Sequence, residues 1–146
     1  LAFLIRQISP MLNVNTVVAV AGPGDEALVR QLGDNIGQLR LISFVGSLNF
    51  QQIGALARVA VGYIGNDTGL THYAAAVGAA TVMILGPTDP ARYRPYTPNA
   101  LALWKPYAVA AEGASAGAPR RFDWERDGIS PADAAEPVLQ FLQGRA

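Results

Sequence analysis

One polar run constrains the fold of this chain more than any other feature. Residues 65–72 read Gly-Asn-Asp-Thr-Gly-Leu-Thr-His, and they lie between an apolar segment at residues 59–64 and an alanine-rich segment at residues 73–77. This order predicts a strand, a tight turn and a helix. A helix that begins in this way leaves backbone N–H groups without partners, with the positive end of the helix dipole behind them. The run therefore predicts a seat for a phosphate or diphosphate group.

Two interpretations of this run stay open on residue types alone. Thr68 and His72 would lie one helical turn apart on the same face, so both side chains could contact one ligand. Yet Asn, Asp, Thr and Gly are also the residues that any strand-to-helix turn prefers for capping. His72, the only histidine, could donate a hydrogen bond to a diphosphate or simply pack against apolar neighbours.

The composition fits one compact domain and excludes several kinds of partner. The chain has 146 residues, of which 51% are hydrophobic, and Lys plus Arg balances Asp plus Glu at 11 each, so no nucleic-acid partner is expected. Without cysteine, and with one histidine, it offers no disulfide, thiolate or multi-histidine metal site, and we expect neither metal nor cofactor. No apolar stretch reaches the roughly 18 residues that span a bilayer, so a cytoplasmic protein is expected.

Apolar runs alternate with polar turns and helical patterns along the chain. The expected strands are residues 15–20, 39–44, 59–64, 81–85 and 101–104, and the expected helices are residues 3–12, 25–32, 49–58, 70–77 and 131–142. Because the strands are continuously apolar, we predict an α/β fold with a Rossmann-like parallel sheet and helices on both faces. Residues 112–119 are expected to form a loop. Pro137 should kink the last helix or delay its start.

The carboxyl ends of the expected strands hold the other candidate residues. In a doubly wound sheet these ends face one crevice, where ligands bind. Asp25 could accept hydrogen bonds from ribose hydroxyls, or it could be a first-turn charge favourable to the helix dipole. Thr88 and Asp89 lie between two prolines, which would suit either a pre-organised polar contact or a rigid loop. The chain has no dinucleotide fingerprint, P-loop or serine elbow.

Two blocks of the sequence resemble known signatures. Residues 66–78 and 82–90 resemble the D-[ST]-G-x-x-H-x-A-A-A-x-G and F-G-[PA]-T-x-P motifs of glycosyltransferase family nine, the bacterial ADP-heptose:lipopolysaccharide heptosyltransferases. Residues 22–26 are similar to the family's G-x-P-x-E/D turn, and residues 47–48 to the segment that borders the adenine. The blocks occur in the family's order and spacing, and the resemblance covers about residues 1 to 105.

The resemblance implies a GT-B enzyme with two Rossmann-like domains. Residues 1–146 would form a single nucleotide-sugar binding domain, the donor-binding C-terminal half, and the acceptor would be held by the other domain. The substrate-binding residues that the resemblance implies are the backbone amides of Thr68, Gly69 and Leu70 for the diphosphate, His72 beside them, Asp67 for the sugar, Asp25 for the ribose and Leu48 for the adenine, with Thr88 and Asp89 in the second block.

Parts of the family pattern lie outside this chain. The first strand of the donor domain would precede Leu1, and the expected sheet is therefore one strand short. The acceptor domain, with the candidate catalytic base, is also absent, so we expect a fragment that is inactive alone. The implied partners are an ADP-sugar and, through the absent domain, a lipid A–core acceptor. Peripheral contact with the cytoplasmic face of the bacterial inner membrane is expected only of the full-length enzyme.

Two other functions stay open on the sequence. The chain could be a non-catalytic nucleotide-sugar-binding module, since one domain can bind a nucleotide sugar without catalysing its transfer. It could also belong to a sugar-nucleotide epimerase of the same fold. An epimerase should need more acid and base groups than one histidine and three carboxylates in the crevice.

Overall fold

The computed structural model describes residues 1–106 and 122–144, and it confirms the α/β prediction. The strands are β1 (Thr16–Ala21), β2 (Arg40–Val45), β3 (Tyr63–Asn66), β4 (Thr81–Ile84) and β5 (Ala100–Leu103). The helices are α1 (Ala2–Ile8), the 3₁₀ turn η1 (Pro10–Leu12), α2 (Glu26–Asn35), α3 (Phe50–Val59), α4 (Gly69–Ala76), α5 (Pro90–Tyr93), α6 (Trp124–Asp127) and α7 (Pro131–Gln143). No helix among the described residues is long and apolar enough to cross a membrane.

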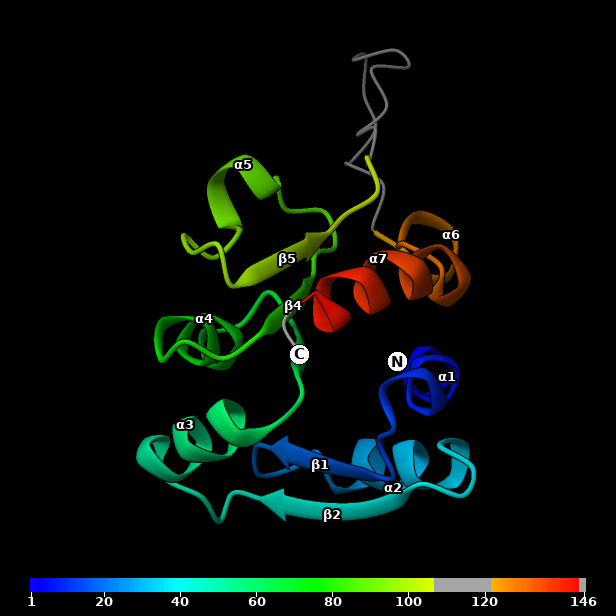
Figure 1. Ribbon diagram of the computed structural model, residues 1–146, viewed down its shortest axis with the longest axis vertical. Coiled ribbons are helices and arrows are strands. Elements are labelled where there is room, and N and C mark those ends of the chain that lie inside the picture. Colours follow the sequence, from blue (N-terminus) through cyan, green and yellow to red (C-terminus); the bar gives the residue numbers. More distant parts are fainter. Residues whose placement is uncertain (107–121, 145–146) are drawn as a thin grey trace.

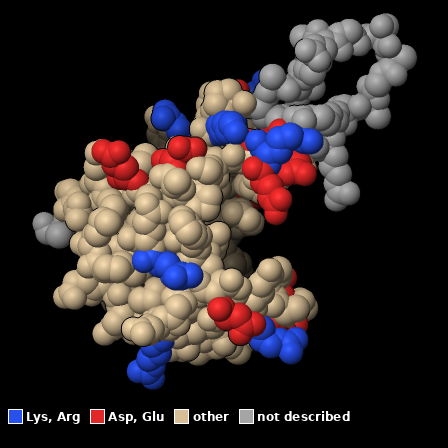
Figure 2. All heavy atoms as spheres, turned by 90° about the vertical axis from the view of Figure 1, so that its right-hand side faces the viewer, with Lys and Arg blue, Asp and Glu red and all other residues tan. Residues whose placement is uncertain are grey.

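The strands form two parallel sheets. One is two-stranded, with the order β1-β2, and the other is three-stranded, with the order β3-β4-β5. Figure 1 shows β1 on the side of β2 that lies toward the upper sheet. In the view of Figure 2, the surface is indented between the lower part, which holds β1 and β2, and the upper part. Within the described residues, β1 and β3 each pair along one edge only.

The main core belongs to the three-stranded sheet and to the helices on one of its faces. Helices α1 and α7 pack against each other, and α7 also covers β5. The buried members of this core are Leu4, Ile8, Val82, Leu103, Ala134, Ala135, Val138 and Leu142. On the other face, α4 packs on β3 and β4 through small residues, in a cluster of Ala57, Ala74 and Ala79. The helices thus cover both faces of this sheet.

The unit formed by β1, α2 and β2 has little core of its own. None of the residues in these three elements is buried. Val18, in the middle of β1, is 42% exposed although the strand is entirely apolar apart from Thr16. An inner strand of a parallel sheet is normally covered on both faces.

Several predicted boundaries are wrong for identifiable reasons. The strand expected at residues 59–64 begins only at Tyr63, because α3 continues to Val59, which is 82% exposed. The first helix ends at Ile8, and Pro10 starts a separate 3₁₀ turn. The last helix is not delayed by Pro137, since Ser130 caps it and Pro131 occupies its first turn. The short helices α5 and α6 were not predicted, and the loop expected at residues 112–119 lies outside the described residues.

Candidate functional site

The turn between β3 and α4 presents backbone N–H groups to its surroundings. Thr68 is the N-cap residue of α4, in an extended conformation, and its carbonyl accepts from the amides of Thr71 and His72 at 3.1 and 3.2 Å. The amides of Gly69 and Leu70 have no acceptor among the described residues. Because these two donors point out of the first turn of a helix, they form an anion-binding geometry.

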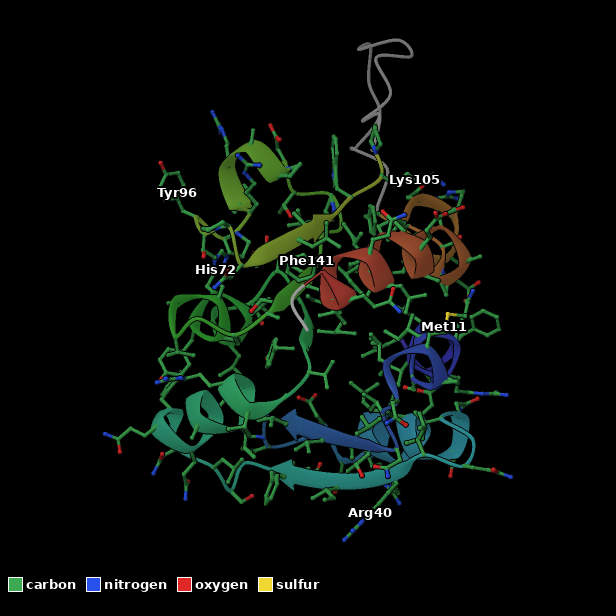
Figure 3. All side chains as sticks on the ribbon, viewed as in Figure 1. Met11, Arg40, His72, Tyr96, Lys105 and Phe141 are labelled. Atoms are coloured by element: carbon green, nitrogen blue, oxygen red, sulfur yellow. The ribbon has the colours of Figure 1, made fainter. Side chains whose placement is uncertain are left out.

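Asp67 and His72 meet beside this turn. The His72 Nε2 atom lies 3.4 Å from the Asp67 Oδ1 atom, and the two side chains are 43% and 23% exposed. Figure 3 shows His72 on the side of α4 that faces α5 in this view. The pair is therefore held together and still open to a ligand. When protonated, the imidazole would add a positive charge next to the free amides.

An apolar cavity of about 410 Å³ opens next to the same turn. It lies at the carboxyl ends of β1 and β2 and at the start of α3. Its lining residues are Val20, Ala21, Gly22, Pro23, Phe44, Gly46, Leu48, Asn49, Phe50, Ile53 and Leu70. The cavity thus brings together Leu48 and Leu70, two of the residues singled out in the sequence, which lie on separate segments. A mainly apolar slot of this kind suits a flat aromatic base.

Asp25 lies at the N-cap of α2, outside the residues that line this cavity. Its Oδ2 atom accepts from the backbone amide of Gly22 at 3.2 Å, and it makes no cap bond to its own helix. The carboxylate therefore closes the turn after β1. The other carboxylate oxygen has no protein partner among the described residues, and both roles considered for Asp25 stay predictions.

Thr88 and Asp89 follow β4, the neighbour of β3, but they are not among the residues that line the cavity. The Asp89 Oδ1 atom accepts from the amide of Ala91 at 2.8 Å and so caps α5. The hydroxyl of Thr88 is buried and has no partner among the described residues. Asp89 thus has a structural role that the proline-flanked loop alone did not reveal.

The structure adds residues that sequence reasoning missed. Phe44, Phe50 and Pro23 form apolar walls of the cavity, and Thr71 is fully buried next to Thr68. Phe50 directly follows the cap residue Asn49, so its place at the start of a helix could have been inferred. Nothing in the local sequence shows that it faces Leu70. No group of three or more histidine, cysteine or acidic residues in the described ranges could hold a metal ion.

Comparisons with known proteins identify the family. A family model described as glycosyltransferase family 9 (heptosyltransferase) matches residues 9–115. The chain is 33% identical over 90 residues to lipopolysaccharide heptosyltransferase 3 of Escherichia coli K12, and 31% identical to another E. coli protein of that name. Each match covers 60% of this chain and 26% of the relative. The chain therefore spans about a quarter of the length of these curated relatives.

A solved structure supports the fold. The crystal structure of a family 9 glycosyl transferase from Veillonella parvula superposes with a TM-score of 0.72 at 21% identity. The superposition covers 98% of this chain and 41% of that one. The fold of this chain therefore corresponds to part of a larger solved protein.

Proposed function

The chain belongs to glycosyltransferase family 9, the heptosyltransferase family, and we propose that it is the donor-binding domain of such an enzyme. Its ligand would be ADP-heptose or a closely related nucleotide sugar. The diphosphate would lie on the free amides that begin α4, and the adenine would enter the apolar cavity. The full-length protein would transfer the sugar to the inner core of lipopolysaccharide at the cytoplasmic face of the inner membrane.

One residue carries this proposal, because it belongs to both parts of the site. Leu70 has a backbone amide without an acceptor among the described residues, and the same residue lines the apolar cavity. A ligand that uses both features needs an anionic group joined through a short linker to a flat, weakly polar ring. A nucleoside diphosphate has this construction. The Asp67–His72 pair would then lie near the bond between the sugar and the diphosphate, and Asp67 could accept hydrogen bonds from the sugar hydroxyls.

The chemistry assigned to this domain is stabilisation of the leaving group. When an acceptor hydroxyl attacks the anomeric carbon, the bond to the diphosphate breaks and negative charge grows on the departing ADP. Fixed amide donors and a protonated His72 would stabilise that charge without reorganisation. The base that takes the acceptor's proton is expected in the other domain, so the proposed domain binds the donor and cannot complete the transfer alone.

The two separate sheets fit the proposed division of the enzyme. A further strand between β1 and β3, from sequence that precedes Leu1, would pair with the free edge of each and cover Val18. The connection from such a strand through α1 to β1 would be the usual strand–helix–strand crossover. We propose that this strand and an acceptor-binding domain complete the protein, as the share of the relatives' length that the chain covers suggests.

Calorimetric titration of the complete gene product with ADP and ADP-heptose tests the proposal. We expect both ligands to bind, and Asp67→Ala or His72→Ala to weaken ADP-heptose by about tenfold, since a hydrogen bond to a charged group contributes about 1.5–3 kcal/mol. Asp34→Ala, which removes an exposed carboxylate from α2, is the matched control and should change nothing. If the two site variants bound like the parent, the site assignment would be wrong.

The same preparation separates the other candidate functions. Transfer of heptose to a lipid A–core acceptor by the complete protein would establish the enzyme. Tight ADP binding without transfer would support a nucleotide-sugar-binding module instead. Isomerisation of ADP-heptose without any acceptor would support the epimerase. No binding of ADP at any concentration would refute the donor site altogether.

A further inference from the structure

Thr71 is a buried polar residue whose role the family motif does not describe. It occupies the third position of α4, and its side chain is fully inaccessible to solvent. Its Oγ1 atom lies 3.2 Å from the Oγ1 atom of Thr68, at hydrogen-bond distance. The Tyr63 side chain, on β3, lies beside the Thr71 hydroxyl. A buried hydroxyl normally has a hydrogen-bond partner, because burying it unpaired costs free energy of folding.

The contact occupies a hydroxyl that would otherwise cap α4. A threonine at the N-cap position usually accepts from the second or third amide of its own helix. In α3, α5, α6 and α7 the N-cap side chain does accept from such an amide. Thr68 makes no bond of this kind, and its hydroxyl turns to Thr71 instead.

We propose that Thr71 is a positioning residue that holds the Thr68 hydroxyl off its own helix and so keeps the Leu70 amide free for the diphosphate. This inference rests on the proposed donor site. Thr71 is not one of the residues proposed to bind the donor, because it is buried and does not itself touch the ligand. Its effect on binding would be exerted entirely through Thr68.

The surroundings of Thr71 fix the direction of its hydroxyl. A Cβ atom at residue 65 would overlap the Thr71 Oγ1 atom, so glycine is needed there for the hydroxyl to occupy its place. Tyr63 approaches the same point from the strand, with its Cε1 atom 3.0 Å from that Cβ position. The hydroxyl thus fills a space bounded by Gly65, Tyr63 and Thr68.

Thr71→Val tests this inference, because valine keeps the shape and removes the hydroxyl. With its partner lost, the Thr68 hydroxyl should cap α4 and compete with the ligand. We expect ADP to bind about fivefold more weakly to the complete gene product, which is the scale of one helix cap. Thr71→Ser restores the hydroxyl and should recover most of the affinity. Thr68→Val combined with Thr71→Val removes the competing cap and should bind ADP more tightly than Thr71→Val alone.

Thr81→Val is the matched control for loss of a buried threonine hydroxyl. Thr81 is also fully buried, and its hydroxyl donates to the carbonyl of Ala79 at 3.0 Å, away from the α4 turn. It should lower the melting temperature at least as much as Thr71→Val and leave ADP affinity unchanged. Equal loss of affinity in both variants, unchanged affinity in Thr71→Val, or a double variant no tighter than Thr71→Val would overturn the inference. If the parent protein itself did not bind ADP, the proposed function would fail instead.

Discussion

Helices α3 and α4 follow β2 and β3, but the two helices differ in whether an N-cap side chain accepts from their first-turn backbone amides. At α3, the Asn49 side chain accepts from the amide of Gln52 at 2.9 Å, and the Gln52 side chain accepts from the amide of Asn49 at 3.0 Å. This reciprocal capping box satisfies the first turn internally. At α4, Thr68 has a side chain able to do the same and does not.

The difference separates a structural helix start from one available to a ligand. An uncapped first turn gives up stability that a cap would provide, about 1 kcal/mol. A protein keeps such a turn without loss only where water or a bound anion satisfies the donors. Both helix starts border the same apolar cavity, through Asn49 and Phe50 on one side and Leu70 on the other. The capped helix therefore contributes a wall, and the uncapped helix contributes the donors.

Of the substitutions predicted to affect the start of α4, Gly65→Ala should lower the free energy of unfolding the most. The new methyl group would overlap the Thr71 hydroxyl and press on Tyr63, and overpacking of this kind costs about 1–3 kcal/mol. Urea denaturation should show this loss, and ADP binding should weaken with it.

The comparable glycine of α3 is Gly54, whose added Cβ would meet the Tyr73 hydroxyl at 2.9 Å. Gly54→Ala should cost less, because the end of a tyrosine side chain can move and alanine favours a helix by about 1 kcal/mol over glycine. A loss at Gly54 equal to that at Gly65 would mean that the α4 turn is no more tightly constrained than the rest of the domain.

Removing the two N-cap side chains compares the helix starts directly. Asn49→Ala should lower the free energy of unfolding by about 1 kcal/mol, because it destroys both bonds of the capping box. Thr68→Ala should lower it by less, about 0.5 kcal/mol, since it breaks the single bond to Thr71 and no cap bond. The measurement is urea denaturation without nucleotide. Equal losses would show that Thr68 caps α4 in solution.

Much of the fold is readable in the sequence, because each strand ends at a polar or glycine-containing turn. The order of the described strands and of the longer helices follows from apolar runs and cap residues, as with Ser130 and Pro131 at the start of α7. The start of β3 was misplaced because Val59 and Val61 are apolar although both are exposed. Local hydrophobicity cannot distinguish such a connection from a strand, since the difference lies in what covers it.

Only the part of the candidate site that is continuous in the chain can be predicted from local sequence. Residues 67–72 are close together in the chain, so local geometry fixes how they meet. Phe44, Leu48 and Leu70 come together only through the packing of β2, α3 and α4. The family resemblance points to Leu48 and Leu70, and nothing in the sequence singles out Phe44. For Asp89 the sequence left a ligand contact and a rigid loop open. The structure shows its Oδ1 atom capping α5, and the ligand contact stays a prediction.

The smallest expected effect concerns the pH dependence of the stability that Tyr63 provides by packing beside Thr71 of α4. Burial raises the pKa of the Tyr63 phenol above its ordinary value of 10.0, and the hydrogen bond from Thr71 opposes this only in part. Below pH 10 the phenol is neutral in both the folded and the unfolded chain, so its contribution to stability is fully present. As the pH rises through 10 and toward the higher folded pKa, the unfolded chain loses this proton first, and folding loses free energy. The advantage of the parent over Tyr63→Phe, measured as the free energy of unfolding in urea, should therefore shrink between pH 8 and pH 11.

The control is Tyr96→Phe, at a fully exposed tyrosine (Figure 3), and its stability should follow that of the parent throughout. If the free energy of unfolding of Tyr63→Phe also changed in parallel with that of the parent across this range, the phenol would not be buried against Thr71 in solution. The start of α4 would then be no more constrained than a surface turn.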